Sequence, residues 1–354
     1  MKINLFVAFI ILIVTSCTSP EKPKNLQWSV QKANEWYQDE EWPVGSNFTP
    51  STAINTIEMW DAETYDSVTI YRELAWASEI GFNTHRVNFQ YLVWARNPEK
   101  FKKRVANFLD ICEKHQQKVM FVFYDDCWNQ DPTLGKQPDP VPGKHNSGWV
   151  QCPGGPIQNA DTALWLVLET FQKDVMNQFR DDKRIICWDL YNEPGNSGYL
   201  NISLPLLKKS FEWAREINPS QPITSGMWSW DEGFKDINQF LTENSDIISF
   251  HHYGPASDLD SLITRLKVHN RPLVCTEYMA RSRDSKFQTH LPLFKKDKVG
   301  AINWGFVSGK TNTIYPWGSP EGAPEPNPWF HDVLRKDGTP FDSLEVKFIK
   351  EITK

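Results

Sequence analysis

Eight short apolar segments recur along the chain, and their alternation with longer amphipathic stretches limits the folds open to it. Short apolar runs bounded by polar residues are typical of buried strands. Strands that alternate with helices favour a parallel sheet joined by right-handed crossovers. The predicted strands are 42–48, 83–89, 118–124, 185–191, 222–228, 246–253, 272–278 and 300–306.

The stretches between these segments carry helical periodicity. Residues 97–115 place Pro98 where a helix can begin and set apolar side chains along one face. Residues 161–179 begin with Asp161, a possible N-cap, and repeat apolar residues in the same way. A third apolar stripe lies in 207–217. These patterns predict helices that would cover the outside of a parallel sheet.

The fold class that follows is α/β, with a single (β/α)₈ TIM barrel over residues 41–354. A doubly wound open sheet is the alternative, but it usually carries a glycine-rich phosphate loop after its first strand. Here that position reads "VGSNFTPS", which has no such motif. The tail from residue 325 predicts a final helix that closes the barrel, and no linker indicates a second domain.

A long loop follows the third predicted strand, at about residues 125–160. In a TIM barrel the functional groups lie on the loops that follow the strands, and a loop of this length is either functional or disordered. Its two tryptophans and two cysteines favour an ordered wall.

The N-terminus has the pattern of an export signal. Lys2 precedes an apolar stretch that is too short for a stable membrane span. "VTSC", ending at Cys17, resembles a bacterial lipoprotein processing site; the resemblance implies removal of the preceding residues and a lipid on the Cys17 thiol. We therefore assign 1–17 to a lipoprotein signal and 18–40 to a tether or N-terminal extension. An ordinary signal peptide is the alternative. The expected location is the bacterial cell envelope, on the periplasmic face or the cell surface.

Composition narrows the possible partners. The net charge is −6, the pI is about 5.8, and charges of both signs are scattered. These features argue against a nucleic-acid partner, and against membrane contact other than the lipid anchor. No motif indicates a cofactor. The 16 tryptophans offer flat faces on which sugars stack. The candidates for sugar contact are Trp128, Trp149, Trp228, Trp230 and Trp317.

The cysteines carry a second expectation. Export would place the mature chain where disulfides persist, and Cys127 and Cys152 fall in the same long loop, so a bridge between them is plausible. Cys187 and Cys275 lie in apolar runs, which predicts buried free thiols. No spacing of cysteines and histidines is typical of a zinc site.

The ends of the predicted strands carry the chemistry. The fourth ends in Asn192-Glu193-Pro194 and the seventh at Glu277. Two glutamates across a barrel rim can approach to about 5–5.5 Å, the separation that retaining glycosidases use. A carboxyl kept protonated by burial can give a proton to a leaving oxygen, and an ionised one can attack the anomeric carbon. The other candidates at strand ends are Arg86, His251, Tyr253 and Trp304.

Together these residues resemble the clan A glycoside hydrolases, especially family 5 cellulases and mannanases. The segments "FYDDCWN", "GKHNSGWVQCPG" and "NWGFVSGKTNTIYPW" are also similar to secreted bacterial proteins labelled cellulase-like or 1,4-β-xylanase. The likeness covers roughly residues 40–335 and rests on the order and spacing of the strand ends. It implies a retaining β-glycoside hydrolase, with endo and exo action both open.

The resemblance also implies a role for each strand-end residue. Glu193 would be the acid/base and Glu277 the nucleophile. Asn192 would bind the sugar 2-hydroxyl, and Trp304 would form the floor of the reactive subsite. The remaining implied roles are orientation of Glu277 by Arg86 and Tyr253, and of Glu193 or a sugar hydroxyl by His251.

One position departs from the family pattern. Family 5 enzymes commonly carry a histidine near the end of the third strand, where this chain has "FYDDCWN". Asp125 or Asp126 would then take over a contact with sugar hydroxyls, which leaves the substrate preference open.

Other interpretations remain at this stage. Arg86 could serve an internal ion pair with Asp189 as well as the site. A metal-dependent hydrolase would pair His251 and His252 with Asp125 and Asp126, although their spacing matches no known ligand set. A glycan-binding lipoprotein without catalysis is the main alternative function.

Overall fold

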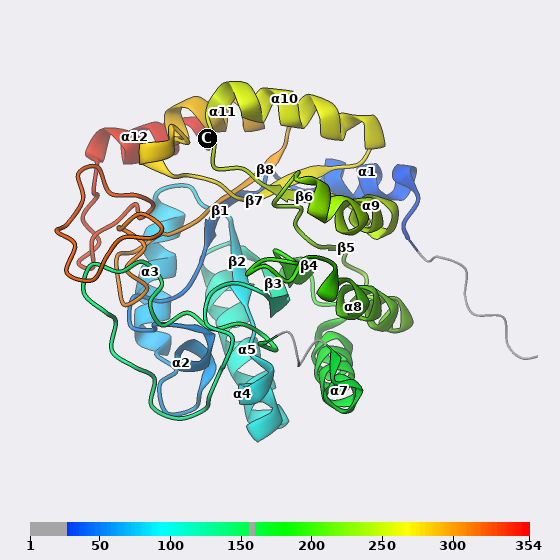
Figure 1. Ribbon diagram of the computed structural model, residues 1–354. Helices are drawn as coiled ribbons and strands as arrows, with labels where there is room; N and C mark the ends of the chain where they lie inside the picture. The colour runs from blue at the N-terminus through cyan, green and yellow to red at the C-terminus, as the bar shows by residue number, and fades with distance from the viewer. Residues whose placement is uncertain (1–26, 156–159) are drawn as a thin grey trace, which may run out of the picture.

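The structure is a computed structural model that describes residues 27–155 and 160–354. Within them, eight parallel strands form one sheet in the order β5-β4-β3-β2-β1-β8-β7-β6 (Figure 1). All eight predicted strands are confirmed, and so is the (β/α)₈ barrel. The strands are β1 (Val44–Asn47), β2 (Thr84–Asn88), β3 (Lys118–Asp125), β4 (Ile185–Asn192), β5 (Ile223–Thr224), β6 (Ile248–His251), β7 (Leu273–Glu277) and β8 (Gly300–Asn303).

The two end strands of the sheet, β5 and β6, meet through contacts outside the regular ladder. The amide of Met227 donates to Ser249 O (3.0 Å), and the amide of His251 donates to Met227 O (2.8 Å). At the other end of this seam, Asp246 and Ile223 exchange two hydrogen bonds of 2.9 Å, one of them through the Asp246 carboxylate. These contacts complete the barrel and fix the height of His251 at its rim.

Helices surround the strands, as Figure 1 shows. Asn97 caps α5, with Pro98 in its first turn, and Asp161 caps α7 through the amides of Ala163 and Leu164, so both predicted helix starts are confirmed. The helices are α1 (Val30–Asp39), α2 (Thr56–Trp60), α3 (Ser67–Glu79), α4 (Tyr91–Arg96), α5 (Pro98–Lys114), α7 (Thr162–Phe179), α8 (Leu204–Ile217), α9 (Lys235–Asn244), α10 (Ala256–Leu266), α11 (Phe287–Lys296) and α12 (Ser343–Ile352).

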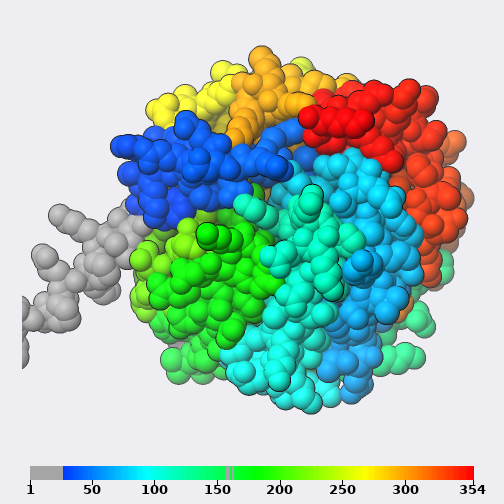
Figure 2. Space-filling model, turned by 180° about the vertical axis from the view of Figure 1, so that it is seen from behind, coloured from blue at the N-terminus to red at the C-terminus, as the bar shows by residue number. Residues whose placement is uncertain are grey.

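The described residues before the first strand, 27–43, form an ordered extension that packs on the barrel. Helix α1 buries Ala33 and Tyr37, and Trp36 packs against the small apolar cluster at the barrel's N-terminal end. The amide of Trp28 donates to Asp246 Oδ1 (2.7 Å). Figure 2 shows this segment, in blue, lying across the back of the molecule. The predicted signal and Cys17, the predicted site of lipidation, lie outside the described residues. No helix among the described residues is long and apolar enough to cross a membrane.

Most apolar side chains lie between the strands and the helices, where they form one continuous core. The interior of the barrel is different at its C-terminal end, because Arg86, Asp189 and Asn192 are buried there among the strands. Buried charged groups need partners close by. These buried polar residues therefore indicate a functional site at the C-terminal end of the barrel.

We predict that Asp246→Ala lowers the free energy of unfolding by about 3 kcal/mol, because it leaves a partly buried Arg215 without its carboxylate and opens the β5–β6 seam. Arg215 contacts both oxygens of Asp246, at 2.8 and 2.9 Å. Urea unfolding would measure the loss. The matched control is Asp110→Ala, which breaks an exposed pair with Arg184 and should cost less than about 1 kcal/mol. Equal losses in the two variants would contradict this account of the seam.

Candidate active site

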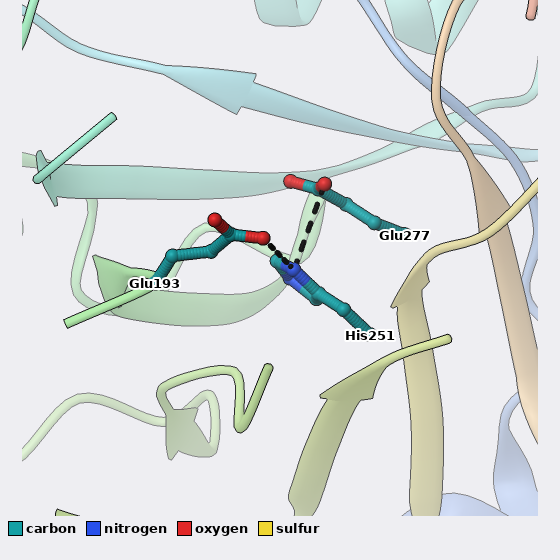
Figure 3. A group of neighbouring side chains, drawn as sticks. All are labelled: Glu193, His251 and Glu277. Atoms are coloured by element: carbon teal, nitrogen blue, oxygen red, sulfur yellow. Dashed lines mark hydrogen bonds and ion pairs between the residues drawn. The ribbon is translucent and has the colours of Figure 1, made fainter. Parts of the chain in front are cut away.

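Three strand ends bring two carboxylates and an imidazole together at the C-terminal rim. Glu193 follows β4, His251 ends β6 and Glu277 ends β7. His251 Nδ1 lies 2.8 Å from Glu193 Oε1 and 3.5 Å from Glu277 Oε2 (Figure 3). One side-chain atom from each of the three residues lies within 4.8 Å of the others. Such proximity matches the short carboxylate separation of retaining glycosidases.

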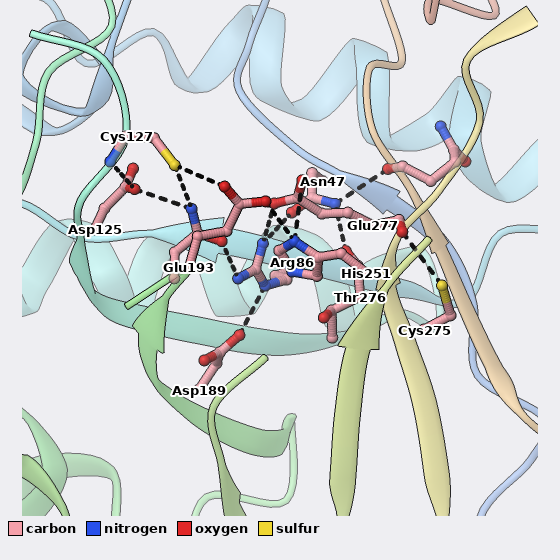
Figure 4. A network of polar contacts seen from close by, with 12 residues as sticks. Asn47, Arg86, Asp125, Cys127, Asp189, Glu193, His251, Cys275, Thr276 and Glu277 are labelled. Atoms are coloured by element: carbon pink, nitrogen blue, oxygen red, sulfur yellow. Dashed lines mark hydrogen bonds and ion pairs between the residues drawn. The ribbon is translucent and has the colours of Figure 1, made fainter. Parts of the chain in front are cut away.

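Arg86 is the buried centre of the network under these groups (Figure 4). Its Nε donates to Asp189 Oδ2 (2.8 Å), and its Nη1 donates to Glu277 Oε1 (2.8 Å). Its remaining donors reach Asn192 Oδ1 (2.7 Å) and Asn47 Oδ1 (2.9 Å). Arg86 therefore serves both the internal ion pair and the site. Burial alone would lower the pKa of Arg86, but the two carboxylates outweigh it and raise that pKa.

Glu193 is held in an unusual backbone conformation at the turn after β4. Its φ is +46°, a left-handed value that costs a non-glycine residue free energy and persists only where surrounding contacts fix it. The Cys127 thiol donates to Glu193 Oε2 (3.1 Å), and Asn196 Nδ2 donates to the same oxygen. These contacts aim the carboxyl at the cavity.

Glu193 and Glu277 have different neighbours, and these neighbours affect the pKa values of the two carboxyls differently. Burial raises the pKa of Glu193, and the hydrogen bonds from Cys127 and Asn196 oppose this only in part. Burial also raises the pKa of Glu277, but Arg86 contacts it directly and the Tyr253 hydroxyl donates to its Oε2 (2.7 Å). A contacting cation favours an ionised carboxylate more than neutral donors do. A single proton shared by the pair therefore resides on Glu193.

His251 does not compete for that proton. Burial lowers the pKa of His251 to about 4, so its ring is neutral near pH 7.

A cavity of about 620 Å³ opens above these groups. Five tryptophans line it, among them four of the five candidates for sugar contact. The fifth candidate, Trp230, does not line it and lies under Arg265. Trp304, expected as the floor, lines it and meets Trp149 edge to face at 5.7 Å. The lining residues are Cys127, Trp128, His145, Asn146, Trp149, Asn192, Glu193, Asn196, Ser197, Trp228, His251, Tyr253, Gly254, Glu277, Arg283, Trp304 and Trp317.

Asp125 is not among the residues that line this cavity, and its expected contact with sugar hydroxyls stays a prediction. It is the last residue of β3, and it is 3% exposed. Its carboxylate accepts from Trp149 Nε1 (2.8 Å), Asn192 Nδ2 (2.9 Å) and the amide of Cys127 (2.8 Å). Asp125 therefore orients residues that do line the cavity.

Asp126 is also buried, against Tyr191 and Ser203, and burial raises its pKa to about 7.

The bridge considered between Cys127 and Cys152 is not present. Both cysteines are buried free thiols, as are Cys187 and Cys275, for which this prediction is confirmed. Cys127 instead faces Glu193, and that carboxylate together with burial holds the pKa of the thiol well above its usual range. The thiol therefore keeps its proton and acts as a donor.

The metal interpretation with Asp125 and Asp126 finds no support in the geometry. Among the described residues, the group that could hold an ion is Glu193, His251 and Glu277, not the aspartates. The Arg86 guanidinium already contacts this group through Glu277, and its charge would repel a divalent cation.

Several contributors escaped prediction. Asn196 follows Glu193 by three residues in the same turn, which was a usable signal. Asn47 ends β1, as the other site residues end their strands. Cys127 and His145 lie in the loop after β3, and Arg283 ends the short 3-10 helix η4 (Arg281–Arg283). For these three residues the sequence gives no distance to the site.

Solved structures of glycoside hydrolases share the fold at low sequence identity. An exo-β-1,4-mannosidase from Opitutaceae bacterium strain TAV5 is 13% identical with a TM-score of 0.60; the match covers 88% of this chain but 59% of that longer protein. An endo-β-1,4-mannanase from Thermotoga petrophila is 14% identical with a TM-score of 0.59, covering 90% of this chain and 77% of that one. A broad-specificity endoglucanase from Clostridium longisporum is 13% identical with a TM-score of 0.59, covering 91% and 97%.

The sequence itself identifies the family. No protein of curated function matches it. The family model described as cellulase (glycosyl hydrolase family 5) matches residues 47–309, which is more than half of the chain. That range runs from Asn47, the last residue of β1, through β8, and it includes all the groups around Arg86. The chain therefore belongs to glycosyl hydrolase family 5 and is a glycoside hydrolase.

Proposed function

We propose that this chain hydrolyses a β-glycosidic bond by double displacement, with retention of anomeric configuration. The observation that carries the proposal is the pair of glutamates whose facing atoms lie within 4.8 Å, one paired with Arg86 and the other with neutral donors. An inverting enzyme needs a wider gap, about 6.5–9.5 Å, to admit a water between its carboxyls.

In the first step, a carboxylate oxygen of Glu277 attacks the anomeric carbon while the glycosidic C–O bond breaks. Glu193 gives its proton to the departing oxygen, so the leaving sugar departs as a neutral alcohol. The product is an ester between the sugar and Glu277. Arg86 and Tyr253 keep Glu277 ionised and aligned before the attack.

In the second step, Glu193 is ionised and takes a proton from water as that water attacks the same carbon. The ester bond to Glu277 breaks, and the carboxylate returns to its pairing with Arg86. Burial raises the pKa of Glu193, which suits a group that must both give and take a proton near neutral pH. We assign the hydrogen bond to the sugar 2-hydroxyl to Asn192, whose side chain contacts Arg86 and Asp125 and lines the cavity.

The substrate we propose is a β-1,4-linked oligo- or polysaccharide of hexoses. The tryptophans on the cavity walls give faces for sugar rings, and the structural neighbours are described as acting on β-1,4-mannan or as endoglucanases. A reducing-sugar assay over mannans, β-glucans and xylans would identify the sugar. We also propose that the mature chain is exported and lipid-anchored at Cys17, which metabolic labelling with a palmitate analogue would test.

We predict that Glu277→Gln abolishes turnover and leaves the fold intact, because the amide cannot form the sugar ester. Activity on the polysaccharide panel and circular dichroism would measure the two effects. The matched control is Glu345→Gln, since Glu345 is also buried and paired with an arginine, Arg281, but lies off the cavity. Near-normal activity of Glu277→Gln on the true substrate would sink the assignment.

We predict that Glu193→Ala loses most activity on natural glycosides, whose leaving oxygen needs a proton, but keeps the first step on 2,4-dinitrophenyl glycosides, whose leaving group needs none. Added azide should restore the second step on the activated substrate and yield a β-glycosyl azide, because it occupies the space left by the carboxyl. Equal loss on both substrate types, with no azide product, would exclude Glu193 as the acid/base.

We predict that Glu193→Gln raises the free energy of unfolding at pH 7 by about 1 kcal/mol, since active-site groups commonly reduce stability. Burial raises the folded-state pKa of Glu193, so the cost of its charge is fully present above that pKa. Below the ordinary glutamate pKa the carboxyl is protonated in both states, and the gain should shrink. Thermal unfolding of the wild type and the variant at pH 7 and pH 4 would measure the gain in stability at each pH. An equal gain at the two pH values would refute the explanation.

A further inference from the structure

Three loops at the C-terminal rim are locked together on one side of the cavity. They follow β1 (48–55), β3 (126–155) and β8 (304–335). Figure 1 shows the loops after β3 and β8, in green and orange, side by side although far apart in sequence. The bonds between them are Asn146 N to Thr311 O (2.9 Å), His145 N to Ser319 Oγ (3.2 Å), Asn312 Nδ2 to Val141 O (3.0 Å), Gly322 N to Pro142 O (2.8 Å), Lys310 N to Ser51 O (3.1 Å) and Asn55 Nδ2 to Gly148 O (2.8 Å).

Two glycines allow the backbones of these interlocked loops to touch. Gly143 has φ +76°, and a Cβ there would lie 2.3 Å from Ala323 N. A Cβ on Gly309 would lie 2.4 Å from Ser51 Cα. Contacts this close leave no room for a substrate chain to pass between the loops.

Aromatic side chains extend this wall from the interlocked loops to Glu277. His145 packs against Trp128 at 5.4 Å and against Trp317 at 6.4 Å. Trp317 meets Tyr253 edge to face at 4.7 Å, and Tyr253 donates to Glu277. Beside them, Trp149 is buried against Trp304. The wall is therefore continuous from the interlocked loops to the reactive carboxylate.

The part of the cavity next to Glu193 is formed by other loops than the wall next to Glu277. There the cavity is lined by Asn196, Ser197 and Trp228, from the loops after β4 and β5. Trp128 separates the wall from an open hollow of about 490 Å³ that continues past Ser197. The hollow is lined by Tyr199 and by residues 128–131 and 151 of the loop after β3, outside the interlocked part of that loop at 141–148.

The proposed chemistry orients a substrate between these two sides. The sugar attacked by Glu277 must lie over Glu277 and Trp304, next to the wall. The leaving oxygen must lie beside Glu193, so the rest of the chain extends toward the open side. Any sugar attached to the non-reducing end of the attacked sugar would meet the interlocked loops.

We infer that this enzyme is exo-acting and removes the terminal sugar from the non-reducing end of a β-linked chain. The inference rests on the proposed function and specifies its mode. Water adds across the first glycosidic bond, releasing one monosaccharide and a chain shorter by one unit.

Linear gluco-, manno- and xylo-hexaoses labelled at the reducing end with 2-aminobenzamide would test this mode. The wild-type enzyme should give labelled pentaose as its first labelled product. Gly143→Val and Asn312→Ala should loosen the interlocked loops and raise the share of labelled tri- and tetraose severalfold. The control is Gly135→Ala, because Gly135 has a positive φ in the same loop but no atom within 4 Å of its Cβ position. Its product profile should match that of the wild type.

The possible outcomes separate the inference from the proposed function. First products that are labelled di-, tri- or tetraose from the wild type would overturn exo action while leaving the glycosidase intact. Cleavage of a polysaccharide with no cleavage of any hexaose would also overturn it, because a long glycone would then be required. No Glu277-dependent hydrolysis of any probe would refute the proposed function, and the exo mode with it.

Discussion

The rest of the site depends on one buried cation, the guanidinium of Arg86. It joins β1, β2, β4 and β7 through Asn47, Asp189, Asn192 and Glu277, and all five side chains are largely withdrawn from water. A buried charge is tolerated only when its partners are close and well oriented. The network therefore fixes the strands against one another and fixes the ionisation of Glu277 at the same time. In this barrel one contact both satisfies the buried charge of Arg86 and pairs Glu277, the carboxylate that we propose as the nucleophile.

Glu193 is held by neutral donors instead of by a cation. Glu193 has no contacting cation, adopts a left-handed backbone, and keeps a raised pKa because it is buried. Each of these features costs stability, and the surrounding apolar core supplies the compensation. Cys127 and Asn196 direct the carboxyl without neutralising it. The two carboxyls differ in their electrostatics because one contacts an arginine and the other only neutral donors, and the roles that we propose for them follow from this difference.

The fold and the strand-end residues could be predicted because both depend on local pattern. Eight apolar runs gave eight strands, and a residue that ends a parallel barrel strand must lie at the rim. Asp125 shows the limit of that rule. It ends β3 as Glu277 ends β7, yet its carboxylate is enclosed by Trp149 and Asn192, because the loop folds back over it. The contacts of Cys127 likewise depend on where its loop travels, and spacing in the sequence does not give that path.

The proposed chemistry depends on residues at strand ends, which could be predicted, whereas the length of substrate that fits depends on loop contacts, which could not. The groups to which we assign the bond cleavage lie at or next to the ends of hydrogen-bonded strands, and their positions follow from the barrel. The wall that closes one end of the cavity comes from loops 126–155 and 304–335, which meet through backbone contacts between residues more than 160 positions apart, such as Asn146 and Thr311. No periodicity in either loop indicates the other. On the proposed function, a barrel with the same strand ends and shorter loops would keep the reaction and accept the middle of a chain, so we attribute the inferred exo mode to the loops.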